Sequence, residues 1–205
     1  TPRLLCEDID WTEGGLLWIK SVSAAAQHRL YDTERDVRKY IRSDHDTEEQ
    51  QINGGISHWT AKGASHSRDG DAVFGANTEE TQINSKYAAW GFRKAKRFFD
   101  VIKWDGDNTV GRTIDHNLKI EPGVIMIKCL SASYGWQVYH RSLGTTSWLY
   151  LNENGEASTA NSPGFANVTN KSFDIGNYIA VNGSGQKYVA YVFAHDPEVD
   201  GIIKC

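Results

Sequence analysis

The 205-residue sequence predicts an all-β protein built from two tandem antiparallel β-sandwich or jelly-roll-like units, and three observations carry this prediction. First, 19 Gly, 7 Trp, 9 Tyr and 7 Phe indicate many turns and many strand-forming residues. Second, blocks of sequence recur along the chain. Third, the second copy of the repeated region consists of short apolar or alternating segments between Gly- and Asn-rich turns, which is typical of strands.

The recurring blocks keep the same order in both halves of the chain. The pattern Lys-Tyr-x-Ala-aromatic-x-Phe begins at Lys86 (KYAAWGF) and again at Lys187 (KYVAYVF), an offset of 101 residues. Upstream, GGLLWIKSVSA (residues 14–24) matches PGVIMIKCLSA (residues 122–132) at an offset of 108 residues. Because the blocks agree in order and in register, the sequence predicts a tandem duplication.

The duplication sets the domain boundaries. Unit 1 is expected to cover residues 1–97 and unit 2 residues 98–205. The two offsets differ by seven residues, so copy one carries an insertion of that length. We expect these extra residues in a polar surface loop between about residues 44 and 83.

The elements of the second copy follow one another in a regular way. FFDVIKW is an apolar strand and DGDNTVG is a turn rich in Asp, Gly and Asn. The closing strand is apolar on both faces, as expected for a strand that is covered on both sides. The expected segments are 98–104, 113–118, 124–130, 136–140 and 147–153, then a long polar loop over about 152–170, then 171–176 and 187–195.

One segment of the first copy is ambiguous when it is considered alone. Residues 31–51 are highly charged and place Val37, Tyr40 and Ile41 on one side of a possible helix. Their counterpart, YHRSLGTTSWLYLNENGEAST, contains Gly144, a Thr-Thr-Ser run and alternating aromatic residues, which is poor helix material. Since duplicated copies share a fold, the sequence predicts strands in both.

Both ends of the chain are unusual with respect to the repeat. LLCEDIDW stands near the start of copy one, where a strand and an Asp/Gly turn are expected, so its first strand is doubtful. The last four residues, IIKC (residues 202–205), correspond to VIKW (residues 101–104), which opens the second copy. We therefore expect IIKC to begin a further unit, to pair with a neighbouring unit, or to complete the sheet of copy one.

Several classes of function find little support in the sequence. The net charge is −4 with a pI near 6.0, so no basic face indicates nucleic-acid binding. The longest apolar runs are far too short to span a bilayer. Three widely spaced cysteines predict neither a disulfide framework nor a zinc site, and we expect no metal, no cofactor and no enzymatic activity.

The histidines and acidic turns point to ordinary structure rather than to chemistry. The seven histidines lack HxH or HxxxH spacing, and SHSRDGD (residues 65–71) lacks the strand–turn–helix context of a nucleophile. The runs Asp69–Asp71 and Asp105–Asn108 could offer oxygen atoms to calcium, but neither completes a calcium-loop pattern. Turns are the favoured interpretation, and calcium stays a secondary hypothesis.

With these motifs in place, the chain resembles a repeat family. The motifs are GLLWIK…HRLYDT…KYIRSD, KYAAWGFRKAKRFFDVIKWDGDNTVGRTIDHNL and PGVIMIK…WQVYHRSLG…WLYLN…VNGSGQKYVAYVFAH, over about residues 14–205. The family occurs mainly in virion proteins of tailed bacteriophages, especially marine phages of cyanobacteria and other ocean bacteria. It brings no catalytic residues.

The resemblance implies a non-enzymatic virion protein, namely a tail-fibre, decoration or adhesion segment made of repeated β-sandwiches. Such a protein is assembled in the cytoplasm of the bacterial host and lies on the exterior of the virion. Its expected partners are other virion subunits or further copies of the same repeat in an oligomer, together with host cell-surface glycan. Nucleic acid and membrane insertion are not expected.

Two other functions compete with this one. A carbohydrate-binding module for bacterial surface glycan would use exposed aromatic residues beside Asp, Asn or Arg, and the many Trp and Tyr allow it. A glycan hydrolase needs two converging carboxylates. The acids Asp32, Glu34 and Asp36 align with His140, Ser142 and Gly144, so they do not recur and a hydrolase is disfavoured.

Receptor contacts are expected from loops that differ between the copies, because the matched strands are committed to the fold. Trp59 is the principal candidate, since a Trp can stack on a sugar or anchor a protein contact. The alternative is that Trp59 folds back onto the end of the sandwich. The further candidates are His58, His66, Arg68 and Asp69 in copy one, and Asn154, Glu156, Asn161 and Phe165 in copy two.

Overall fold

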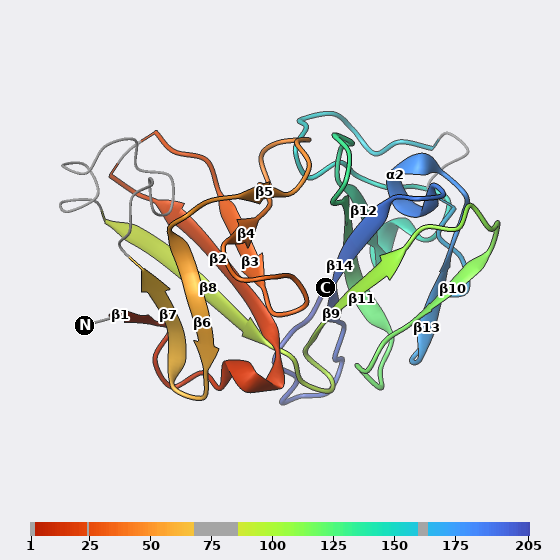
Figure 1. Ribbon diagram of the computed structural model, residues 1–205. Helices are drawn as coiled ribbons and strands as arrows, with labels where there is room; N and C mark the ends of the chain where they lie inside the picture. Colours follow the sequence, from red (N-terminus) through yellow and green to blue (C-terminus); the bar gives the residue numbers. More distant parts are fainter. Residues whose placement is uncertain (1–2, 24, 68–85, 160–163) are drawn as a thin grey trace. The chain divides into compact units, whose positions relative to one another are not determined.

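The computed structural model describes residues 3–23, 25–67, 86–159 and 164–205 (Figure 1). The fold is all-β and antiparallel, as the sequence predicts. The chain divides into unit 1, Thr1–Asp44 with Glu49–Arg93, and unit 2, His45–Glu48 with Lys94–Cys205. This division lies close to the boundary predicted between residues 97 and 98.

The described residues of unit 1 form three small sheets, with strand orders β3-β2-β8, β1-β7-β6 and β4-β5. A short 3₁₀ helix, η1, precedes the long strand β2 and is capped by the Asp10 side chain, which accepts from the Thr12 backbone N–H. The elements are β1 (Arg3–Leu5), η1 (Trp11–Glu13), β2 (Gly15–Ser21), β3 (Arg29–Asp32), β4 (Lys39–Tyr40), β5 (Gln50–Gln51), β6 (Gly55–Thr60), β7 (Gly63–Ser67) and β8 (Tyr87–Arg93).

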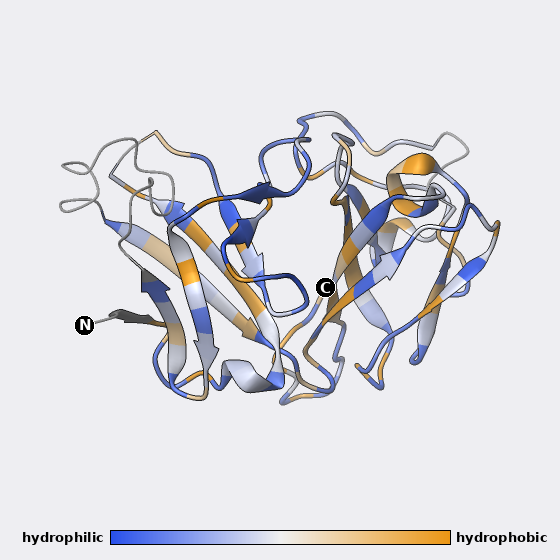
Figure 2. Cartoon of the chain, viewed as in Figure 1, coloured by the Kyte–Doolittle hydropathy of each residue, from blue (hydrophilic) through white to orange (hydrophobic). Residues whose placement is uncertain are grey.

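The core of unit 1 joins its two three-stranded sheets. Alternate residues of β2 point into it, and they meet residues of β6 and β7 and the indole of Trp11 in η1. Figure 2 shows the corresponding alternation of apolar and polar segments along the strands. The buried members are Trp11, Leu17, Ile19, Tyr31, Tyr40, Ile56 and Ala64.

Unit 2 contains a four-stranded sheet of order β12-β11-β14-β9 and a two-stranded sheet of β10 and β13. Short helices follow β12 and precede β14. The elements are β9 (Phe99–Asp105), β10 (Arg112–Asp115), β11 (Pro122–Cys129), β12 (Gln137–His140), η3 (Arg141–Leu143), β13 (Ser172–Ile175), α2 (Ile179–Asn182) and β14 (Lys187–Ala194).

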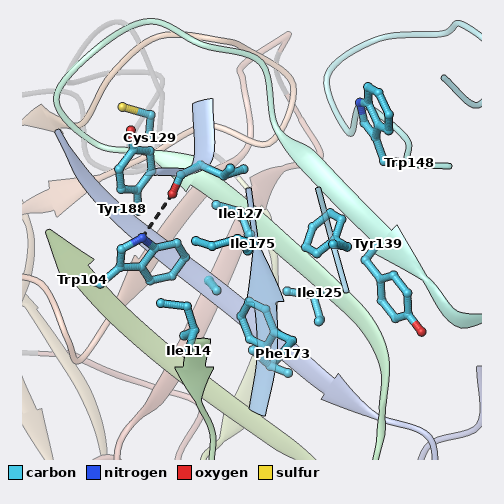
Figure 3. Packing of buried hydrophobic residues seen from close by; sticks show 14 of the residues in the cluster. Trp104, Ile114, Ile125, Ile127, Cys129, Tyr139, Trp148, Phe173, Ile175 and Tyr188 are labelled. Atoms are coloured by element: carbon cyan, nitrogen blue, oxygen red, sulfur yellow. Dashed lines mark hydrogen bonds between the residues drawn. The ribbon is translucent and has the colours of Figure 1, made fainter. Parts of the chain in front are cut away.

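The core of unit 2 lies between these two sheets, as Figure 3 shows from close by. Every second residue of β11 and β14 enters this core and meets Phe173 and Ile175 of β13. The indole of Trp104 stacks on the Tyr188 ring, with centroids 5.6 Å apart, and its Nε1–H donates to the Val181 carbonyl at 3.1 Å. Aromatic pairs of this kind add about 0.5–1.5 kcal/mol beyond the burial of their area.

The sheets β3-β2-β8 and β12-β11-β14 share one register. Leu17 pairs with Tyr31 and Gly91, and at the two sequence offsets Ile125 pairs with Tyr139 and Val192. The side-chain contacts also repeat: Ser23 Oγ accepts from the Lys86 N–H at 2.8 Å, and Ser131 Oγ from the Lys187 N–H at 2.9 Å. The prediction that Lys86 with Tyr87 and Lys187 with Tyr188 occupy equivalent places is therefore confirmed.

The ambiguous segment 31–51 forms short strands rather than a helix, as the comparison of copies predicts. Leu30 and Ile41 form a β-bridge in unit 1, and Val138 and Leu149 form the equivalent bridge in unit 2. Residues 147–153, however, contribute only isolated bridges and no strand. The helix α2 was not predicted either.

The extra residues of unit 1 are predicted in a surface loop between about residues 44 and 83. The described part of this range forms β5, β6 and β7, and residues 68–83 lie outside the described residues, so the loop stays a prediction. β1 pairs with β7 in the same register in which β10 pairs with β13, at an offset of 109 residues. The sequences of β7 and β13, GASHS and SFDI, share no motif that could have revealed this.

This pairing also clarifies the start of unit 1. β1 is the counterpart of β10, whereas the first strand that the sequence leaves doubtful is the counterpart of β9. Among the described residues of unit 1, no strand corresponds to β9.

The C-terminal segment forms no strand with the described residues of its own chain. The Asp196 N–H donates to the Ile203 carbonyl at 2.9 Å, and the Cys205 N–H donates to His195 Nδ1 at 3.0 Å. Ile203 packs against the core of unit 2, whereas the Ile202 side chain is 80% exposed. Pairing of this segment with a neighbouring chain stays a prediction.

Candidate functional site

Three loops meet at one end of unit 2 and bring three tyrosines together. Tyr134 follows β11, Tyr150 lies beyond the Val138–Leu149 bridge, and Tyr178 immediately precedes α2. The end of unit 2 that carries α2 is at the upper right of Figure 1. We call Tyr134, Tyr150, Tyr178 and the adjacent Ile179 the tyrosine cluster.

Close backbone packing holds the first two loops of the cluster together. The Asn152 side-chain Oδ1 accepts from the Trp136 backbone N–H at 2.8 Å. A Cβ atom at Gly135 would lie 3.3 Å from the Tyr150 ring and 3.4 Å from Asn152 Oδ1. Gly135 therefore allows the loop of Tyr134 to rest directly on the loop of Tyr150.

The core of unit 2 fixes the third loop. The Tyr188 hydroxyl donates to the Ile179 carbonyl and accepts from the Gly183 N–H at 2.8 Å. The N–H groups of Val181 and Asn182 donate to the Tyr178 carbonyl at 2.9 and 2.8 Å. These hydrogen bonds fix the backbone of the turn that carries Tyr178 at the surface.

The cluster is exposed in part and packed in part. Tyr178 and Ile179 are 37% and 42% exposed, while Tyr134 and Tyr150 are half-buried against the core. Burial raises the pKa of Tyr178, and the nearby hydroxyls of Tyr150 and Tyr134 raise it further. Tyr178 therefore keeps its O–H donor at neutral pH. Figure 2 shows apolar colouring on α2 beside it.

This arrangement can bind a ligand that offers both an apolar face and hydroxyl groups. Tyrosine rings supply apolar contact, their hydroxyls donate and accept hydrogen bonds, and the exposed Asn177 and Glu153 add polar groups at the rim. At the offset of 108 residues, unit 1 has Ala26 and Arg42 in place of Tyr134 and Tyr150. The cluster is therefore a property of unit 2.

The acidic turn after β9 is a closed polar network. Asn182 is fully buried, and its amide group donates to Asp107 Oδ1 at 2.9 Å and to the Thr109 carbonyl at 3.0 Å. The Arg112 guanidinium donates to Asn182 Oδ1 at 3.1 Å and lies 3.4 Å from Asp107 Oδ2. Backbone and side-chain donors from Thr109 and Asn182 lower the pKa of Asp107. Its carboxylate is thus already engaged in the turn.

No group of three or more potential metal ligands occurs within the described ranges. The second acidic run, Asp69–Asp71, lies outside the described residues. In unit 1, Asp32 is buried and bound by Arg35, with Nε 2.6 Å from Oδ2, and it also caps the turn that follows β3. A carboxylate with these partners is a structural group rather than a catalytic acid.

Trp59, the principal predicted contact residue, lies in strand β6 and not in a loop. Its half-buried ring packs on Trp11 at the core of unit 1, with centroids 5.1 Å apart. The prediction that Trp59 lies in a loop is therefore wrong, and its packing on Trp11 agrees with the alternative that it folds back onto the sandwich. Its role as a contact residue stays a prediction. Its neighbour His58 is exposed, because successive residues of a strand face opposite sides.

The other predicted residues do not form one site. His66 is half-buried in β7, and Asn154 and Glu156 are exposed beyond Tyr150. Phe165 is buried in the core of unit 2, with its ring centroid 5.6 Å from that of Tyr139, so its prediction as a contact residue is wrong. Three candidates, Arg68, Asp69 and Asn161, lie outside the described residues.

Sequence reasoning missed the tyrosine cluster. The sequence predicts Tyr150 in an alternating strand, and Tyr134 stands in a short turn, SYGW. A comparison of the copies, position by position, would have shown that unit 1 lacks both tyrosines.

None of the helices in the described part of the chain has the length and apolar character needed to cross a bilayer. Comparison with known proteins finds one family. Residues 12–202 match the family model described as a domain of unknown function (DUF7483), and this match spans both units. No curated protein and no solved structure matches the chain. The chain therefore belongs to the DUF7483 family of domains of unknown function.

Proposed function

We propose that the chain is a non-enzymatic structural segment of a bacteriophage virion, of the tail-fibre, decoration or adhesion type. The observation that carries the proposal is the shared register of β3-β2-β8 and β12-β11-β14, which is the architecture of a repeated β unit. The resemblance of its motifs to phage virion repeats supports the same function. The partners proposed are further copies of the repeat and other virion subunits, on the particle exterior.

Immunogold electron microscopy tests this proposal. An antibody raised against the recombinant chain is applied to phage particles purified from lysates of the host that produces it. We expect label on the outside of intact particles, with a preimmune antibody as the control. Label confined to the host cells, with bare particles, would contradict the proposal.

A second candidate function, the binding of bacterial surface glycan, is favoured by the tyrosine cluster. Its exposed ring at Tyr178 and its rigid attachment through Tyr188 fit a sugar face better than the residues chosen from the sequence. A glycan array probed with the whole chain tests it, and we expect retention on a subset of glycans. Loss of polysaccharide chain length during incubation would instead support a hydrolase.

A further inference from the structure

The outer edge of β8 in unit 1 has no partner strand among the described residues. β8 lies at the end of the sheet β3-β2-β8 and pairs with β2 alone. Such an edge presents a row of backbone N–H and C=O groups that can pair with another chain.

The equivalent strand of unit 2 is covered on both sides. β14 pairs with β11 on one side and with β9 on the other, where Ala190 faces Ile102 and Tyr191 faces Val101. Since β8 and β14 share the register to β2 and β11, the outer edge of β8 corresponds to the edge of β14 that β9 covers.

The burial of the two strands reflects this difference. All residues of β14 except Lys187 are buried, whereas Ala89, Trp90 and Arg93 of β8 are exposed. Trp90 is 47% exposed, and its counterpart Tyr191 is fully buried. A large apolar ring at an uncovered strand edge indicates a surface that a further strand would bury.

The backbone of β8 is oriented to receive that strand. The Lys86 carbonyl accepts from the Val22 N–H, so every second residue from Lys86 turns its backbone groups toward β2. Ala89 and Gly91 therefore turn theirs outward. In unit 2, the Ala194 N–H donates to the Phe98 carbonyl at 2.9 Å on the equivalent side.

The C-terminal segment of the chain resembles in sequence the strand that covers the equivalent edge in unit 2. At the offset of 101 residues, Gly201–Cys205 (GIIKC) corresponds to Asp100–Trp104 (DVIKW), the central part of β9. The segment holds Ile202, which is 80% exposed, and none of its residues is in a strand. The C-terminal segment and the β8 edge thus each carry an exposed apolar side chain, Ile202 and Trp90.

The geometry points to a strand exchange between chains: the edge of β8 accepts residues 201–205 of a second copy as an antiparallel strand in the register of β9. The register of β9 on β14 then places Ile203 opposite Ala89 and Ile202 opposite Trp90. Lys204 lies opposite Ala88. The side chains of Ile202 and Trp90 lie on one face and cover each other.

Association in this mode has two physical consequences. Residues 201–205 must first leave their own unit, where Ile203 packs on the core and the Cys205 N–H donates to His195. Because the exchange then joins two chains, it depends on protein concentration. Residues 201–205 and the edge of β8 are two different surfaces of the chain, so the contact is head-to-tail and adds chains into an open row or a ring. The inference is independent of glycan binding and of the virion location.

A mixed-disulfide experiment with the full chain tests the register. Trp90→Cys and Ile202→Cys chains are prepared separately, mixed and oxidised. Directly opposite residues of a non-hydrogen-bonded antiparallel pair have Cα atoms about 4.5 Å apart, which a disulfide can bridge. We expect a covalent dimer in the mixture at several times the level seen with either variant alone. The single variants give the background from the native cysteines.

Val199 provides the matched control, because it is 98% exposed and lies outside the proposed strand. A mixture of Trp90→Cys with Val199→Cys should stay at background. In sedimentation velocity over a concentration series, Ile202→Asp should weaken association at least about tenfold, since it sets a charge against Trp90. Val199→Asp should match the parent. A parent that stays monomeric at all concentrations, or equal crosslinking at positions 199 and 202, overturns the inference.

Discussion

At the scale of single residues, the absence of a side chain at Gly106 allows a close contact in unit 2. Gly106 stands in the acidic turn after β9, where its backbone N–H donates to the Gln186 carbonyl at 2.8 Å. A Cβ atom there would lie 2.1 Å from the Gly183 carbonyl oxygen and 2.8 Å from the Tyr188 ring. The turn and the strand β14 can approach this closely only because residue 106 has no side chain.

Gly106→Ala should therefore lower the free energy of unfolding by about 1–3 kcal/mol, the usual cost of overpacking. Gly155→Ala is the matched control, because no heavy atom lies within 4 Å of the Cβ it would add. It should change stability by less than about 0.5 kcal/mol. Urea unfolding followed by Trp fluorescence measures both. Equal stability of the two variants would show that the turn yields without cost.

The Trp59 side chain contributes both a favourable packing contact and an unfavourable buried polar group. Its ring packs on Trp11, but its indole N–H is buried without a hydrogen-bond partner within the described residues. Trp59→Ala should lower the free energy of unfolding by about 2–4 kcal/mol, because a cavity opens beside Trp11.

Trp59→Phe should cost much less, since it keeps an aromatic ring and removes an unsatisfied donor. The same urea titration compares the two variants. If both variants are as stable as the parent, the packing on Trp11 contributes nothing. Host-cell binding of the folded Trp59→Phe chain should equal that of the parent.

At the scale of elements, an ion pair ties the turn before β9 to the end of β14. The Arg97 guanidinium binds Asp196 through two contacts of 2.8 and 2.6 Å, and this hydrogen bonding to Arg97 lowers the pKa of Asp196 below its ordinary value of 3.8. Because the folded pKa is the lower one, the carboxylate stabilises the fold above pH 3.8. This stabilisation is lost as the pH falls through the folded value.

Asp196→Asn should thus be less stable than the parent at pH 7, and the difference should shrink as the pH falls below about 4. Melting temperatures measured between pH 3 and 7 test the expectation. Asp115→Asn, at an exposed position of β10, is the control and should keep a constant small difference. A gap for Asp196→Asn that does not change with pH would exclude the ion pair as its cause.

The equivalent strands β2 and β11 allow a paired test of the two cores. Leu17 and Ile125 are matched by the repeat and both are fully buried, each in the core of its own unit. Leu17→Ala and Ile125→Ala should each lower stability by about 2–5 kcal/mol. Hydrogen exchange read by mass spectrometry should show faster exchange in β2, β3 and β8 for the first variant and in β11, β12 and β14 for the second. The same pattern for both would contradict separate cores.

Some strands could be predicted from the sequence and others could not. The central strands were predictable because Lys86/Lys187 and Gly15/Gly123 anchor two ungapped blocks, and period-two burial then follows. The strands β6 and β7 were not, because GISHWT and GASHS are polar and have little in common with unit 2. Pairing of β7 with β1 and of β6 with β7, rather than local propensity, makes them strands.

The site was less predictable than the fold for a related reason. Comparison of the copies directs attention to loops that differ in length, but Tyr134 and Tyr150 lie where the two copies align without a gap and differ in single residues. Tyr134, Tyr150 and Tyr178 are far apart in the sequence, and only the packing of Gly135 on the loop of Tyr150 and the attachment of α2 by Tyr188 bring them together.

At the scale of the whole molecule, the described residues offer a partly exposed aromatic cluster on unit 2 and, on unit 1, the edge of β8 that no described strand covers. The first suits a ligand and the second suits another copy of the chain. A fibre-like particle component that attaches to cells would use both kinds of surface, and neither requires catalysis. The two surfaces involve different residues, so variants can separate attachment from assembly.

Tyr178→Ala tests the attachment surface. The side chain is 37% exposed, so its removal should cost little stability. If the cluster binds glycan, the dissociation constant for the glycan selected on the array should rise at least about fivefold, the effect of losing roughly 1 kcal/mol at a contact residue. Tyr178→Phe should fall between this variant and the parent, because it keeps the ring and loses the hydroxyl. Trp90→Ala is the control, since it removes an exposed aromatic residue from unit 1 and should leave glycan affinity unchanged. Isothermal titration calorimetry gives the three affinities. Equal affinity of the parent and Tyr178→Ala would exclude the cluster as the site, and an equal loss in Trp90→Ala would mean that binding follows assembly rather than this surface.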